Sequence, residues 1–253
     1  MSAPLTYVYC LVQRARRPAL RGVPPGIAGS RELRALDAGG GLWIIASSVP
    51  EQEMGEAAVQ RGLQNLDWVG RRAMEHERIV EAFLEAPAVL PMQLFTLFKT
   101  DERALAHVAR DRARIDAILK RIAGHVEWGL RLTWDEQGVR RQVEQAHARP
   151  RSGSDYLARK KDLLDVNRVR LADARHEAER VYTAMARAAA GARRRTATEQ
   201  AATGSRLLLD AAFLVPVRGA AKFKTALRQQ TKALAAAGLG VSLTGPWPPY
   251  NFI

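Results

Sequence analysis

Histidine and carboxylate side chains come closest together at Glu75, His76 and Glu77. A zinc-protease motif would place a second histidine four residues after the first, on the same face of a helix. Residue 80 is Val80, so this motif is absent. His76 lies on or beside an apolar helical stripe, and we expect a buried core histidine rather than a metal ligand. The other four histidines share no ligand spacing: His107, His125, His147 and His176.

Other catalytic patterns are also missing from the sequence. Acidic residues lie mostly on helices beside arginines, as Glu75 does beside Arg71 or Arg72, and this spacing is typical of solvated ion pairs. Gly238-Leu239-Gly240 is followed by Val-Ser-Leu and not by a helix-opening glycine, so no phosphate-binding loop is predicted. The single cysteine, Cys10, falls in an apolar strand pattern and should be buried and inert. We therefore predict no enzyme activity, no cofactor and no metal site.

The last nine residues, 245–253, form the most distinctive segment of the chain. Three prolines prevent a helix or a central strand there, and three aromatic residues accompany them: Trp247, Tyr250 and Phe252. A stiff segment of this kind loses little entropy when it docks. It should therefore bind either in a groove between two domains of its own chain or in another protein. The first alternative is favoured, because exposed aromatic triplets promote aggregation.

The chain is strongly basic, with 39 lysines and arginines against 26 acidic residues and a net charge of +13. This charge favours acidic partners, which include nucleic acid, anionic lipid and acidic protein. Trp128 and Trp134 would share one face of a strand and could stack on bases. That face also carries Val126, Leu130 and Leu132, which favours a protein core instead.

The longest apolar run, residues 207–217, contains Asp210 and is too short to span a bilayer. The first residues lack the basic segment and apolar run of a signal peptide. The lone cysteine fits a reducing compartment. We therefore expect a soluble, cytoplasmic protein.

Hydrophobic periodicity predicts an α+β protein of two domains. Strands are predicted at residues 5–12, 32–36, 42–49, 89–98, 125–134, 193–200, 207–217 and 239–244. Helices are predicted at residues 66–86, 101–123, 154–190 and 220–237. The strand at 89–98 is apolar on both sides and should be central. Residues 145–153 should be a polar linker.

The boundary between the domains is predicted near Gly124. Residues 1–124 would form an N-terminal α+β domain, residues 125–245 a C-terminal domain, and residues 246–253 a tail. The second domain would have the order strand, helix, strand, strand, helix, strand, with a long first helix. This βαββαβ order is ferredoxin-like.

A set of short motifs follows in order along nearly the whole chain. They are Tyr7-Val8-Tyr9, Leu66-Asp67-Trp68, Glu75-His76-Glu77, Val89-Leu90-Pro91-Met92, Ser152-Gly153-Ser154-Asp155-Tyr156-Leu157, Ala212-Phe213-Leu214-Val215-Pro216 and Leu243-Thr244-Gly245-Pro246-Trp247-Pro248-Pro249-Tyr250. With these motifs the chain resembles the gas vesicle accessory protein family GvpF/GvpL. It departs from the family at Gln93-Leu94-Phe95-Thr96, where the family usually has Arg-Phe-Gly-Thr.

The resemblance implies a two-domain protein with a ferredoxin-like C-terminal domain that serves gas vesicle assembly without catalytic turnover. Its partners would be the small hydrophobic shell protein and other accessory proteins. Such binding needs an exposed apolar groove or sheet edge. The predicted partner-binding residues are Met92, Phe95 and Phe98 of the middle strand, and Trp247, Tyr250 and Phe252 of the tail. The alternative is a basic module that binds nucleic acid or another polyanion, with affinity that falls steeply with salt.

Overall fold

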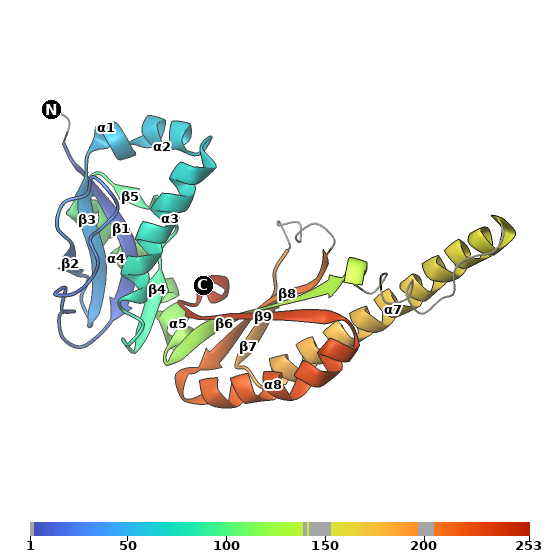
Figure 1. Cartoon of the computed structure of the whole chain (residues 1–253). Helices are drawn as coiled ribbons and strands as arrows, with labels where there is room; N and C mark the ends of the chain where they lie inside the picture. The colour runs from blue at the N-terminus through green and yellow to red at the C-terminus, as the bar shows by residue number, and fades with distance from the viewer. Residues whose placement is uncertain (1–2, 139–140, 142–152, 197–204) are drawn as a thin grey trace. The chain divides into compact units, whose positions relative to one another are not determined.

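The computed structural model describes the chain except for residues 1–2, 139–140, 142–152 and 197–204 (Figure 1). The chain divides into two compact units. The first contains residues 1–126 together with 247–253, and the second contains residues 127–246. Each unit combines helices with one sheet of antiparallel strands. The predicted linker at 145–153 falls almost wholly outside the described residues.

The first unit has a sheet of five strands in the order β2-β3-β1-β4, and β5 pairs with β1 as well. The strands are β1 (Leu5–Gln13), β2 (Arg34–Asp37), β3 (Leu42–Val49), β4 (Ala88–Pro91) and β5 (Leu97–Phe98). The helices are α1 (Glu51–Met54), α2 (Glu56–Gly62), α3 (Leu66–Glu81), α4 (Asp101–Arg110) and α5 (Arg112–Ile122), and a short 3-10 helix η2 (Tyr250–Phe252) belongs to the same unit.

The central strand β1 is apolar on both faces because it is covered on both sides. Its residues from Thr6 to Val12 are all buried, and it pairs with β3, β4 and β5. The strands predicted at 32–36 and 42–49 pair as an antiparallel hairpin, in which the first strand lies at 34–37. Three consecutive glycines, 39–41, have positive φ in its turn, a conformation that side chains with a Cβ adopt only under strain.

The predicted single central strand at 89–98 is wrong. The segment forms two short strands, β4 and β5, and β4 lies at one end of the sheet. The interruption is a turn in which the amide and the hydroxyl of Thr96 both donate to the carbonyl of Gln93, at 3.1 and 2.7 Å. Phe95 has φ +66°, and its amide donates to the Tyr7 hydroxyl at 3.3 Å. A contact with β1, distant in sequence, therefore stabilises a break that local apolarity conceals.

The predicted helix at 101–123 is also divided, into α4 and α5, at Asp111. Thr100 caps α4, and its hydroxyl accepts a hydrogen bond from the amide of Arg103 at 3.3 Å. The helix predicted to reach residue 86 ends at Glu81. No prediction was made for α1 and α2, whose short sequences carry no clear period.

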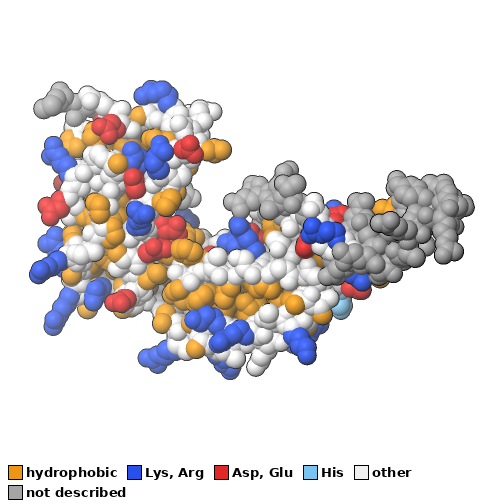
Figure 2. Space-filling view, viewed as in Figure 1, with side chains coloured by type: hydrophobic (Ala, Val, Ile, Leu, Met, Phe, Trp, Pro, Cys, Tyr) orange, Lys and Arg blue, Asp and Glu red, His pale blue; other side chains and the backbone are white. Residues whose placement is uncertain are grey.

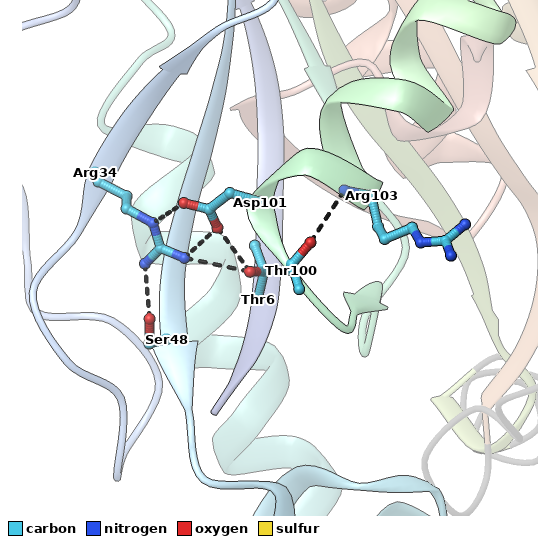
Figure 3. Close-up of polar contacts among 6 residues, drawn as sticks. All are labelled: Thr6, Arg34, Ser48, Thr100, Asp101 and Arg103. Carbon is cyan, nitrogen blue, oxygen red and sulfur yellow. Dashed lines mark hydrogen bonds and ion pairs between the residues drawn. The ribbon is translucent and has the colours of Figure 1, made fainter. Parts of the chain in front are cut away.

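An ion pair holds α4 to the sheet (Figure 3). The guanidinium of Arg34 on β2 contacts both carboxylate oxygens of Asp101, at 2.8 and 2.5 Å. Thr6 on β1 donates to the same carboxylate at 2.7 Å, and Arg34 also donates to the Ser48 hydroxyl at 3.0 Å. Arg34 lowers the pKa of the Asp101 carboxyl below its usual range. The first turn of α4 is thereby joined to three strands.

The second unit has four strands in the order β7-β8-β6-β9. Its elements are β6 (His125–Asp135), α7 (Gly153–Arg187), β7 (Gly191–Arg194), β8 (Ser205–Pro216), the 3-10 helix η1 (Val217–Gly219), α8 (Ala220–Ala236) and β9 (Leu239–Trp247). The edge strand predicted at 193–200 is the shorter β7, and residues 197–200 lie outside the described residues. β9 runs to Trp247 instead of stopping at residue 244, and an edge strand can include Pro246 because its outer side needs no ladder donor.

Both helices pack together on one face of the second sheet (Figure 1). Phe213 on β8 contacts Phe223 on α8 and Tyr182 on α7, with ring centroids 5.5 and 5.9 Å apart. Trp128 and Trp134 on β6 are 6% and 1% exposed. The core assignment of these two tryptophans is therefore confirmed, and their rings are not available to stack on bases.

Candidate partner-binding groove

A groove with a volume of about 400 Å³ lies in the first unit, between the end of β4 and helices α4 and α5. Its apolar lining consists of Leu11, Leu90, Pro91, Met92, Val108, Ile115, Ile118 and Ile253. Four of these are largely covered, with Leu11, Leu90, Val108 and Ile115 all below 9% exposed. Its polar lining consists of Gln93, Thr96, His107, Asp111 and Arg114.

Helical spacing brings the α4 and α5 side chains to one side. Val108 and Ile115 are seven residues apart and Ile118 follows three residues later, so they recur at about two turns and one turn. On the sheet side, Pro91 closes β4 and the Met92 amide donates to the Tyr9 carbonyl at 2.9 Å. Met92 thus stays fixed to β1 beyond the end of β4, half-buried in the groove lining.

The three predicted residues of the middle strand do not form one surface. Met92 lines the groove, and the Phe98 ring lies 5.3 Å from the ring of His107, which lines the groove too. Phe95 is directed elsewhere. Its ring stacks on Trp68 of α3, with centroids 5.3 Å apart and planes 15° apart, against the core of the first unit.

The tail packs on the first unit. Phe252 is 5% exposed, and its carbonyl accepts a hydrogen bond from Arg121 of α5 at 2.6 Å. The following residue, Ile253, reaches the groove and is 36% exposed. Trp247 and Tyr250 are half-buried. The structure therefore joins Met92 and the end of the tail, two segments that sequence reasoning selected independently, in one groove.

Several groove residues were missed by sequence reasoning: Leu90, Val108, Ile115, Ile118 and Ile253. The apolar period of residues 104–122 could have identified Val108, Ile115 and Ile118 as one helical face. That period alone does not separate a covered core face from a groove. The distinction depends on which elements pack above the helices.

His76 lies in the core of the first unit and does not line the groove. His76 is 4% exposed, and its Nδ1 lies 2.9 Å from the Tyr7 hydroxyl. Burial lowers the pKa of His76 to about 4 and raises the pKa of Tyr7. The expected core histidine is therefore confirmed, and it is neutral at physiological pH.

Cys10 is fully buried, and burial raises the pKa of its thiol, as expected for an inert cysteine. Within the described ranges, no group of three or more His, Cys, Asp or Glu side chains has the geometry of a metal site. The helices in those ranges also include none with the length and apolarity needed to cross a bilayer. The groove itself offers apolar contact area with a polar rim, which suits binding of an apolar segment.

Comparisons with known proteins cover nearly the full chain. Residues 5–253 match the sequence family described as gas vesicle synthesis protein GvpL/GvpF. Gas vesicle protein L of Streptomyces sp. (strain CB03234) is 32% identical over 258 residues, which cover 98% of this chain and 92% of that protein.

Two crystal structures share the fold. The gas vesicle protein GvpF from Anabaena sp. PCC7120 has a TM-score of 0.69 at 15% identity, covering 98% of this chain and 95% of that one. GvpF from Microcystis aeruginosa has a TM-score of 0.67 at 14% identity, covering 99% and 98%. The motifs, the two units and the match over residues 5–253 lead to one assignment: this chain belongs to the gas vesicle GvpL/GvpF family.

Proposed function

We propose that this chain is an accessory protein of gas vesicle assembly that binds the hydrophobic shell protein, together with other accessory proteins, in the cytoplasm and at gas vesicles. Membership of the family implies a role in gas vesicle formation. The family consists of gas vesicle accessory proteins and is not a known enzyme family. The finer assignment, binding of the shell protein, rests on the groove of the first unit.

The observation that supports this assignment is the meeting of Met92 and Ile253 in one open apolar groove. A groove lined by Leu, Ile, Val and Met side chains is partly exposed to water, and covering it with an apolar segment would stabilise a complex. Ile253 of the tail already occupies one part of the lining. The tail would therefore either add contact area for the shell protein or be displaced by it.

The Phe98 ring contacts His107 of the groove lining, and Phe252 directly precedes Ile253 in the chain, so we propose both as partner-binding residues with Met92. Trp247 and Tyr250 of the tail are half-buried, and we propose them as further contacts for the partner. Phe95 would contribute less, because its ring is already stacked on Trp68.

We further infer that the two units correspond to the predicted domains at residues 1–124 and 125–245, with residues 246–253 as the tail. The chain order β6, α7, β7, β8, α8, β9, together with the sheet order β7-β8-β6-β9, supports a ferredoxin-like second domain. The nucleic-acid alternative has weaker support, because the two tryptophans that could stack on bases are buried.

The test is binding of purified shell protein to the full chain and to two charge-matched variants on α5. Ile118 is half-buried in the groove lining, whereas the neighbouring Ala117 is exposed outside it. Ile118→Glu should weaken binding about tenfold, because it puts a charge into apolar contact area. Ala117→Glu adds the same charge and should leave binding within about twofold.

Melting temperatures of both variants establish that they fold. Equal binding by Ile118→Glu and Ala117→Glu would move the shell-protein site away from the groove. Failure of the unmodified chain to bind shell protein at all would refute the proposed function.

A further inference from the structure

Helix α8 of the second unit carries four basic residues and no acidic residue along its 17 positions. One face of the helix buries Phe223, Leu227 and Leu234. The basic residues are all exposed: Lys222, Lys224, Arg228 and Lys232. The last three follow each other at four-residue spacing, so they form a row about 12 Å long on one side of the helix.

Basic side chains gather over the region that α8 occupies (Figure 2). The imbalance extends beyond the helix, because residues 211–253 contain no aspartate or glutamate. This stretch of sequence therefore supplies no acidic side chain of its own that could pair with the basic residues of α8.

Helices α3, α5 and α7 each pair at least one arginine with a carboxylate of the same helix. Arg72 pairs with Glu75 on α3, at 2.7 Å. Arg112 pairs with Asp116 on α5, at 2.8 Å. Arg180 pairs with Glu177 on α7, at 2.7 Å.

Helix α8 shows no such pairing. Within the part of the chain that the structure describes, none of its four basic residues forms an ion pair with a carboxylate. Lys224 instead lies 5.4 Å from the Trp128 ring, and Arg228 donates to the Thr225 hydroxyl at 3.1 Å. The positive charge of α8 is left for solvent ions or for another molecule to neutralise.

This charge pattern works against the helix itself. Like charges four residues apart destabilise a helix, and Lys222 stands in the first turn, where the helix dipole favours acidic residues. Gly219 at the N-cap supplies no side-chain cap. An acidic partner laid along the row would remove the repulsion and would add its own attraction.

We propose that the exposed basic face of α8 is a docking surface for an acidic segment of a protein partner, separate from the groove of the first unit. Charge complementarity identifies the occupant as acidic. Proteins that bind single-stranded nucleic acid commonly add exposed aromatic rings on which bases stack, and α8 exposes none. The neutral polar side chains of Thr225 and Gln229, which lie beside the row, suit hydrogen bonding to a peptide.

The experiment uses the full chain and two probes of similar length and charge, a fluorescein-labelled glutamate peptide of about 20 residues and a labelled single-stranded DNA of about 20 nucleotides. Binding is measured by fluorescence anisotropy at about 50 mM and about 200 mM salt. One variant combines Lys222→Gln, Arg228→Gln and Lys232→Gln, and it keeps Lys224 so that the contact with Trp128 remains.

The matched control removes the same charge from the exposed loop of the first unit through Arg16→Gln, Arg17→Gln and Arg21→Gln. We expect the α8 variant to bind the glutamate peptide about tenfold more weakly, with a shallower salt dependence, and the loop variant to change by less than about twofold. Unchanged melting temperatures would exclude unfolding as the cause.

Equal weakening in both variants would show a general effect of net charge and overturn the proposal, as would undiminished binding in the α8 variant. Tighter binding of DNA than of peptide, lost in the α8 variant, would assign the face to nucleic acid instead. Both probes are highly charged and are not expected to bind the apolar groove. A negative result for α8 would therefore leave the shell-protein proposal unaffected, and the reverse also holds.

Discussion

Replacing Asp101 with asparagine removes the charge that ties α4 to the first sheet. The carboxylate receives two hydrogen bonds from Arg34 and one from Thr6, and the two ionic side chains are 26% and 29% exposed. Hydrogen bonds to charged groups contribute about 1.5–3 kcal/mol when they are partly shielded from water. Asparagine keeps one acceptor oxygen, so we expect Asp101→Asn to lower the free energy of unfolding by about 2 kcal/mol.

The matched control is Asp116→Asn, which breaks the pair with Arg112 on α5. The Asp116 side chain is 51% exposed, and a pair of this kind within one helix contributes about 0.3–0.5 kcal/mol. Urea unfolding of the three proteins gives the comparison. The double variant Arg34→Gln with Asp101→Asn should cost less than the sum of the two single variants, because either one alone leaves an unpaired charge.

The same pair predicts a pH dependence. Arg34 lowers the pKa of Asp101 in the folded state. Its stabilisation is therefore fully present above the carboxyl pKa of the unfolded chain, about 3.9, and is lost as pH falls through the lower folded pKa. The difference between the unmodified chain and Asp101→Asn should be constant from about pH 7 to about pH 5 and should shrink below about pH 4. A difference no larger than that of Asp116→Asn, at any pH, would refute this account of how α4 is held.

Two further predictions concern His76 and Phe252. Burial lowers the His76 pKa to about 4 from 6.5, so the unfolded chain takes up a proton between these pH values while the folded chain does not. Stability should fall by about 3 kcal/mol over that range, and the fall should be absent in His76→Gln when both are unfolded in urea; identical pH profiles would contradict it. Phe252→Ala removes a side chain that is 5% exposed, and the tail should detach locally so that chymotrypsin cleaves after Tyr250 at least about tenfold faster. An unchanged cleavage rate, followed by mass spectrometry, would show that other contacts hold the tail.

Hydrophobic periodicity correctly predicted the helices and strands in which the same face is covered by neighbouring elements along the whole length. The alternation of residues 125–134 marks β6 because one face of that strand packs on helices, and the run at 5–12 marks β1 because both of its faces are covered. The positions of α7, β8 and α8 follow from the same periodicities. The family resemblance, which rested on short motifs in order, was confirmed by the match over residues 5–253.

Prediction failed where a distant contact overrides a local preference. Apolar residues predominate in the segment around Leu94 and Phe95, yet the Tyr7 hydroxyl, 88 residues away in sequence from Phe95, accepts that residue's amide hydrogen bond and a turn replaces the strand. The division between α4 and α5 at Asp111 is also hidden in the sequence, because the helical spacing of apolar residues continues through it. The break at Asp111 carries no glycine or proline that would have marked it in the sequence, whereas Pro91 ends β4 just before the other break.

The sequence alone determined the family, the α+β class, the basic charge and the docking tendency of a tail rich in proline and aromatics, because each depends on residue types in local order. Only the tertiary structure decided that Met92 and Ile253 share a groove, that the Phe95 ring stacks on Trp68 instead, and that the basic residues of α8 form no ion pair with any carboxylate in the described ranges. These facts are relations between segments far apart in sequence, and hydrophobic packing and hydrogen bonding fix such relations only when the chain is folded.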